Sequence, residues 1–201
     1  MENKLKILAA SDIHGESKIV QKLAETAKKE KVDLVILCGD ITSIKETKNI
    51  IHPFKEKNQE ILIIPGNWDS KESIDKIVSL YEIKNIHGKY SIHKDVAIFG
   101  SGGGWPGFKP TSEKEIYNTL KKAHKKIKNK KKKIMITHLH PSGSLSEFSG
   151  VPGSQAIRKA IEDFQPNVLL HGHIHEAAGA IEKIGKTIVI NVGKQGKIIE
   201  I

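Results

Sequence analysis

Val32-Asp33-Leu34-Val35-Ile36-Leu37-Cys38-Gly39-Asp40 is the stretch that sets the architecture of this chain. Its mainly apolar residues predict a buried strand over Val32 to Leu37. The run ends at a glycine and an aspartate, so a polar side chain stands directly beyond the strand. Leu5 to Ala10 and Ile61 to Ile64 have the same character, and each is also followed by a polar turn.

Helical patterns separate these three strands. Apolar residues with helical spacing follow the first strand, and they are Ile19, Val20, Leu23, Ala24 and Ala27. Ser43 with Glu46 predicts a capped helix start after the second strand. Asp69 with Glu72 predicts another after the third, with a helix that runs to about Leu80. Three strand–helix units in succession favour a mainly parallel sheet with helices outside.

The second half of the chain has shorter and more varied patterns. Tyr90 to Phe99 has hairpin-like spacing and leads into a glycine-rich loop over Ser101 to Gly107. Ser112 and Glu115 predict a capped helix through about Lys128. The remaining expected elements are a strand over Ile134 to Thr137, a helix over Ser154 to Phe164, a strand over Val168 to Leu170, and a terminal antiparallel meander of Ala177 to Ile184, Thr187 to Val192 and Lys197 to Ile201. We expect one α/β layered domain over residues 1–201.

The charge balance is strongly basic. Lys and Arg number 33 against 23 Asp and Glu, a net charge of +10, and Arg158 is the only arginine. A positive field attracts phosphates and nucleic acids, whereas lysine without arginine does not favour sequence-specific reading of bases. The densest basic stretch, Lys121 to Lys133, is compatible with a solvated face and with nucleic-acid contact.

The composition also indicates the cellular compartment of the protein. The single cysteine, Cys38, cannot form a disulfide within the chain, and the first residues lack the apolar stretch of a secretory signal. No apolar run approaches the roughly 18 residues of a membrane span. We therefore expect a cytoplasmic protein that does not enter a membrane.

Metal-capable side chains follow nearly every predicted major strand. They are Asp12, His14, Asp40, Asn67, His138, His173 and His175. A lone aspartate is often a turn residue and a lone histidine is often on the surface, but residues beyond the carboxyl ends of parallel strands converge on one edge. Imidazole, carboxylate and amide ligands without thiolate fit Mn, Fe, Zn, Ni or Co. Seven such ligands suit two divalent ions that share a carboxylate, as in phosphoryl transfer.

These residues form five blocks in a fixed order. The blocks are Asp12-Ile13-His14, Gly39-Asp40, Gly66-Asn67-Trp68-Asp69, His138 and Gly172-His173-Ile174-His175. Together they resemble the pattern of the calcineurin-like metallophosphoesterases, and in detail the small archaeal and bacterial Icc-related phosphoesterases. The resemblance implies a four-layer αββα sandwich of mixed sheets flanked by helices.

The resemblance also implies roles. Asp12, His14 and His175 would bind one ion, and Asn67, His138 and His173 the other, with Asp40 bridging. Gly172 would permit the turn that sends the two histidines after it to different ions. The expected enzyme is a dinuclear-metal phosphoesterase, preferentially of diesters, in which a metal-bridging hydroxide attacks phosphorus and Asp40, Asn67 and His138 take part in catalysis. Its substrate is a phosphate ester, with nucleotides among the candidates and manganese among the ions.

Trp68 departs from the family pattern, in which many members carry a histidine that protonates the leaving oxygen. His140 is our candidate for a substitute proton donor, against a plain loop histidine. Trp68 is either a flat wall for a nucleobase or aryl group or a space-filling residue, and Asp69 is expected to cap the next helix. Gly102 to Pro106 is no P-loop, and both a substrate-side role and a flexible connector fit it. A nuclease and a non-catalytic scaffold are the alternative functions.

Overall fold

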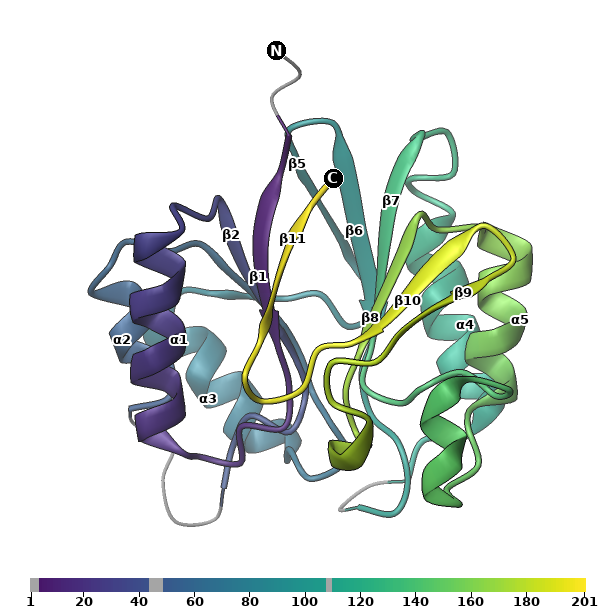
Figure 1. The fold of residues 1–201 in the computed structure, drawn as a ribbon, viewed down its shortest axis with the longest axis horizontal. Coiled ribbons are helices and arrows are strands. Elements are labelled where there is room, and N and C mark those ends of the chain that lie inside the picture. Colours follow the sequence, from purple (N-terminus) through teal and green to yellow (C-terminus); the bar gives the residue numbers. More distant parts are fainter. Residues whose placement is uncertain (1–3, 44–48, 108–109) are drawn as a thin grey trace.

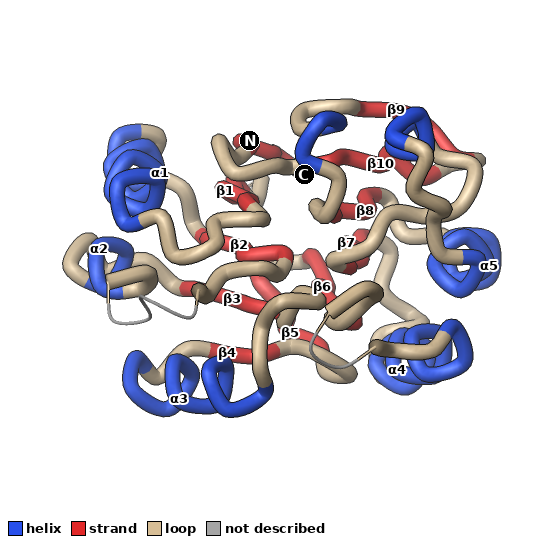
Figure 2. The backbone as a smooth tube through the Cα atoms, turned by 90° about the horizontal axis from the view of Figure 1, so that it is seen from below, coloured by secondary structure: helices blue, strands red, loops and turns tan. Residues whose placement is uncertain are grey.

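The structure is a computed structural model that describes residues 4–43, 49–107 and 110–201. Two β-sheets pack face to face, and a layer of helices covers the outer face of each (Figure 1, Figure 2). This is the four-layer αββα sandwich that the family resemblance implies. No helix of the described part of the chain has the length and apolar character to cross a membrane.

The first sheet contains the strands predicted from the N-terminal half. Its order is β11 (Lys197–Glu200), β1 (Lys6–Ala10), β2 (Leu34–Cys38), β3 (Ile61–Ile64) and β4 (Lys84–Asn85). β1 to β4 run parallel, and β11 lies antiparallel to β1. Its outer face is covered by α1 (Ser17–Lys29), α2 (His52–Lys55) and α3 (Lys71–Tyr81).

The second sheet contains the strands of the C-terminal half. Its order is β5 (Tyr90–His93), β6 (Val96–Ser101), β7 (Lys132–Thr137), β8 (Val168–His171), β10 (Thr187–Asn191) and β9 (Ile181–Ile184). The helices α4 (Glu113–His124) and α5 (Gln155–Phe164) cover its outer face. Two short 3₁₀ helices, η1 (Leu145–Ser149) and η2 (His175–Ala177), interrupt the loops after β7 and β8.

The core follows from the period-2 geometry of the strands. Ile7 and Ala9 of β1 face the second sheet, whereas Leu8 and Ala10 face the helices. Both faces of the central strands are therefore covered, which is why their sequences are apolar without alternation. Between the sheets, residues of β1 to β3 pack against residues of β6 to β8 and of β10.

The parallel strands of both sheets end at the same edge of the sandwich. We call the loops that follow β1, β2, β3, β6, β7 and β8 at this edge the rim, and the opposite edge, where these strands begin, the amino-end edge. The rim lies at the bottom of Figure 1 and faces the reader in Figure 2. All the predicted site residues lie on rim loops.

The last strand does not complete the predicted meander. β10 already has β8 on one side and β9 on the other, so it offers no free edge to β11. β11 instead crosses to the first sheet, where it pairs antiparallel with the open edge of β1. The predicted antiparallel pairing of β9 with β10 is confirmed, but the third strand was placed wrongly because the prediction assumed that consecutive strands are neighbours.

Helix boundaries differ from the predictions in two places. Ser70, and not Asp69, caps α3, because the Ser70 hydroxyl accepts a hydrogen bond from the Ser73 N–H. Ser112 caps α4 as predicted, but this helix ends at His124 and not near Lys128. The capping pair predicted at Ser43 and Glu46 falls partly on residues 44–48, outside the described residues.

Candidate metal centre

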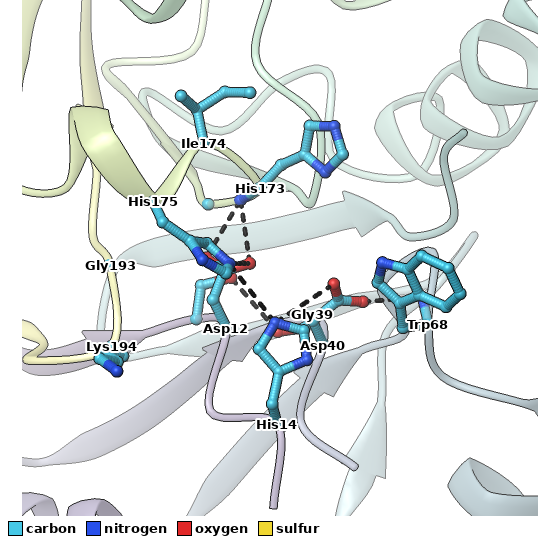
Figure 3. Close-up of polar contacts among 12 residues, drawn as sticks. Asp12, His14, Gly39, Asp40, Trp68, His173, Ile174, His175, Gly193 and Lys194 are labelled. Carbon is cyan, nitrogen blue, oxygen red and sulfur yellow. Dashed lines mark hydrogen bonds and ion pairs between the residues drawn. The ribbon is translucent and has the colours of Figure 1, made fainter. Parts of the chain in front are cut away.

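The rim brings side chains together from five separate loops. Asp12, Asp40, Asn67 and His138 are all buried there, with no more than 3% of each residue exposed. His14 and His173 are half-buried, and His175 is exposed. Figure 3 shows Asp12, His14, Asp40 and His175 around a common centre, with the His173 ring turned away from it. Sequence positions as far apart as 12 and 175 thus form one cluster.

One group of possible metal ligands consists of Asp12, His14 and His175, whose ligand atoms lie within 4.8 Å of one another. The Nε2 atoms of the two histidines are 3.4 Å apart, and His175 Nε2 lies 3.6 Å from Asp12 Oδ1. Two imidazole nitrogens that face each other beside a carboxylate form a donor set suited to a transition-metal ion.

A second group consists of Asp12, Asp40 and His138, again with ligand atoms within 4.8 Å. His138 Nε2 lies 3.4 Å from Asp40 Oδ2 and 2.7 Å from Asn67 Oδ1. Asp40 Oδ2 is also 3.8 Å from His14 Nε2. Asp12 is thus a member of both groups, and the Asp40 carboxylate, a member of the second group, also lies near His14 of the first.

The surroundings of His138 favour a positive charge at its Nε2 atom. Its Nδ1–H donates to the Cys38 carbonyl at 2.9 Å, while its Nε2 faces only oxygen acceptors. Burial alone would lower the pKa of His138, but the hydrogen bond to Asp40 and the charge of that carboxylate raise it to about 9. A cation among Nε2, Asn67 Oδ1 and Asp40 Oδ2, whether a proton or a metal ion, satisfies all three atoms. The residues present thus fit a metal ion.

The two buried carboxylates stay ionised. Burial would raise the pKa of Asp12, but the hydrogen bond from His175 and the charge of His138 outweigh it and hold this pKa below its usual range. Burial opposes ionisation of Asp40 as well, yet contacts with His138 and the Trp68 N–H lower its pKa. Two buried negative charges side by side are costly unless cations compensate them, and compensation by divalent ions is one solution.

His173 belongs to neither group, although its backbone is part of the cluster. Its N–H donates to both carboxylate oxygens of Asp12, at 3.1 and 3.2 Å. The ring centroid lies 5.2 Å from that of His138. His173 itself makes the turn, with φ of 72°. Gly172 serves a different need, because a Cβ there would lie 2.4 Å from Asp12 Oδ2.

Four residues of the cluster adopt the left-handed backbone conformation. They are Asp12, His14, Asp40 and His173, with φ of 58°, 47°, 50° and 72°. Residues with a Cβ rarely adopt this conformation, and outliers of this kind concentrate at functional sites. The turns are bonded together across the rim, since the His14 N–H donates to the Asp40 carbonyl at 2.9 Å.

Asp69 has a larger role than a helix cap. Its carboxylate accepts hydrogen bonds from the N–H groups of Ile41, Thr42 and Gly66 and from the Thr42 hydroxyl, at distances from 2.7 to 3.2 Å. It therefore clamps the loop that carries Asp40 to the loop that carries Asn67. This positioning role was missed from the sequence, where the only signal was an aspartate close behind a strand end.

The glycine-rich loop after β6 packs against the cluster. The Gly103 N–H donates to the Pro65 carbonyl at 2.9 Å, and the Asn67 side-chain amide donates to the Pro106 carbonyl. That second bond turns Asn67 Oδ1 toward His138. A Cβ on Gly107 would lie 2.0 Å from the Asn67 carbonyl oxygen. The loop is thus a close-packed support for Asn67, so a flexible connector does not describe it.

His140 lies behind the cluster, with 0% of the residue exposed. Its Nε2–H donates to the Val151 carbonyl at 3.2 Å, and its ring is stacked against His173 with centroids 6.1 Å apart. Its buried Nδ1 has no hydrogen-bond partner within the described residues. The role of proton donor stays a prediction.

Comparisons with known proteins show the family and the fold to which this chain is similar. The sequence matches the calcineurin-like phosphoesterase superfamily domain over residues 5–199. It is 34% identical to an uncharacterised protein of Methanocaldococcus jannaschii, over 95% of this chain and 89% of that protein.

Solved structures show the same fold. A protein of Thermus thermophilus superimposes with a TM-score of 0.77 at 19% identity, over 96% of this chain and 91% of that one. A structure described as a novel archaeal phosphodiesterase has a TM-score of 0.57 at 18% identity and covers 98% of both chains.

Proposed function

The chain belongs to the calcineurin-like phosphoesterase superfamily, and from this premise we propose that it hydrolyses phosphodiesters with two divalent metal ions held at the rim. Membership makes it a metal-dependent hydrolase of phosphoester bonds. The number of ions, the preference for diesters and the role of each ligand are the parts that we propose.

One observation carries the proposal. Asp40 Oδ2 lies within 4 Å of His14 Nε2 and of His138 Nε2, which belong to different ligand groups. A pair of ions that share a ligand requires a carboxylate that reaches both groups; Asp12 is a member of both groups, and Asp40 contacts a histidine of each. We assign His14, His175 and Asp12 to one ion and His138, Asn67 and His173 to the other, with Asp40 between them.

The chemistry follows from this arrangement. Two divalent ions would supply positive charge for the phosphoryl oxygens and lower the pKa of a water molecule from 15.7 to about 7, which makes it a nucleophile. Asp12 and Asp40 would bring negative charge to the ions, and Asn67 and the histidines would hold the ions in position. The Cys38 carbonyl holds the His138 ring so that Nε2 points into the cluster.

Two features support a diester with a good leaving group. Trp68 stands beside Asn67 where a proton-donating histidine would assist a poor leaving group, and the indole cannot act as an acid. The structure described as an archaeal phosphodiesterase shares the fold over nearly the whole chain.

The nuclease alternative has less support. The lysine-rich segment from Lys125 to Lys131 joins the end of α4 to the start of β7, so it leads to the amino-end edge and not to the rim. A charged surface at that edge does not guide a nucleic acid into the metal centre.

The test is an activity assay with a matched variant. The manganese-loaded protein should hydrolyse bis-p-nitrophenyl phosphate faster than p-nitrophenyl phosphate, and metal analysis should find two ions per chain. Asp40→Asn should reduce kcat/KM by about 10³-fold, since metal ions contribute several kcal/mol and each tenfold is about 1.4 kcal/mol. Asp95→Asn, an exposed carboxylate at the amino-end edge, should change nothing. No turnover with any transition metal would contradict the proposal.

A further inference from the structure

We propose that Trp68 is a stacking platform that binds a flat aromatic group of the substrate, either a nucleobase or an aryl ring, beside the metal centre. This inference rests on the proposed function and adds to it the chemical class of one ester substituent.

Trp68 is held at the centre by its backbone. Its N–H donates to Asp40 Oδ1 at 2.8 Å. On its two sides, Asn67 and Asp69 are buried at 2% and 8% exposure and are fixed by their own hydrogen bonds. The main chain at Trp68 is therefore fixed relative to Asp40, and little ordering entropy remains to be lost at the backbone when a ligand binds.

The side chain behaves differently from the backbone. Trp68 is 47% exposed, although it stands between two buried residues. Figure 3 shows its indole beyond Asp40, on the side of the cluster away from His175. A core residue would be covered, so Trp68 does not belong to the core.

An exposed apolar side chain is ordinary on a protein surface, as at Leu80 or Tyr90. Trp68 differs because its N–H bonds the Asp40 carboxylate, which contacts His14 and His138 of the metal centre. When the phosphorus of an ester lies beside Asp40, the substituents of the ester extend over the residues next to Asp40. The substituent on the Trp68 side meets a large π-face, and any aromatic ring stacks on such a face with little dependence on its identity.

The absence of charge on the indole narrows the ligand class. A short alkyl group covers little of a flat apolar face, whereas a nucleobase or an aryl ring covers much of it. We therefore assign this side of the centre to the aromatic part of the substrate, and the metal ligands to its phosphate.

The experiment compares two product-like inhibitors that differ only in the base. Adenosine 5′-monophosphate and ribose 5-phosphate share phosphate and ribose, so the ratio of their inhibition constants measures the contribution of the ring. We expect the manganese-loaded protein to bind the nucleotide about tenfold more tightly, which corresponds to about 1.4 kcal/mol. Trp68→Ala should abolish this ratio, Trp68→Phe should keep most of it, and the control Tyr90→Ala should keep all of it.

A second measurement does not depend on turnover. Stacking should quench tryptophan fluorescence when the nucleotide is added, and Trp68→Phe should remove the quenching. A ratio that is unchanged in Trp68→Ala would overturn the platform while leaving the phosphodiesterase intact. Failure of the proposed function has a different signature, because then no variant, wild type included, hydrolyses a phosphoester.

Discussion

The rim and the amino-end edge place the same residue types in opposite surroundings. At the amino-end edge, carboxylates pair with lysines in water, as in Lys94–Asp33 at 2.8 Å and Lys132–Asp95 at 3.0 Å. At the rim, Asp12 and Asp40 are buried against histidines. The two edges belong to the same strands, so the difference comes from burial.

This difference predicts where substitutions matter. An exposed ion pair contributes at most about 1 kcal/mol, because water screens it and ordering long side chains costs entropy. A buried charge has lost its water and depends on each partner, so removing a partner is far more costly. The rim should therefore be sensitive to single changes, and the amino-end edge tolerant.

The largest effect on stability is expected at Asp69. Asp69→Ala leaves the N–H groups of Ile41, Thr42 and Gly66 without their acceptor, and each buried unsatisfied group costs about 1–3 kcal/mol. We expect a loss of about 3 kcal/mol in urea unfolding and weaker metal binding by calorimetry. Asp95→Ala, the same change at the opposite edge, should have a much smaller effect because water screens that carboxylate. Equal losses of stability in Asp69→Ala and Asp95→Ala would contradict the difference between the two edges.

A smaller effect is expected at Gly107. In Gly107→Ala, the new Cβ would clash with the Asn67 carbonyl oxygen, and overpacking of this kind costs about 1–3 kcal/mol. Because Asn67 must move, kcat/KM should fall together with stability. In Gly100→Ala, the new Cβ on β6 would clash with the Ile136 carbonyl oxygen of β7, so this variant should lose stability but keep its metal affinity. Normal activity in Gly107→Ala would show that the loop does not support Asn67.

The smallest effect is expected for Lys94→Ala at the amino-end edge, with a cost no greater than about 1 kcal/mol. Burial would raise the pKa of Asp33, but hydrogen bonds from Lys94 and the Lys6 N–H lower it below the usual 3.8. The stabilisation by ionised Asp33 is therefore complete above pH 3.8, and it is lost as the pH falls through the lowered pKa. Thermal unfolding of both proteins at pH 7 and pH 3 should show the difference shrinking in acid. A difference that grows in acid would reverse the sign of this argument.

Some of the rim could be predicted from the sequence because its signals are local. Asp12, Asp40 and His138 each stand just beyond an apolar run, and parallel strands bring such positions to one edge. Asp69 could not be interpreted in the same way, since its partners Ile41 and Thr42 lie 28 and 27 positions away. The local pattern there suits a helix cap equally well.

The order of strands was harder to predict than their existence. The apolar character of β11 was visible, but its partner depends on which edges other strands leave open. The support given by the glycine-rich loop was hidden for a similar reason. A glycine in the sequence indicates that space is short or that the backbone turns, but it does not identify the residue that lies against it.

The left-handed turns at Asp12, His14, Asp40 and His173 have a consequence for local opening. Each non-glycine residue in this conformation costs about 1–3 kcal/mol, so the loops that present the ligands carry local strain. Amide protons in these loops should exchange with deuterium before those of the strands behind them. Any ion that binds the presented side chains would oppose this opening, so the slowing of exchange on adding manganese would map, amide by amide, which loops the ion holds.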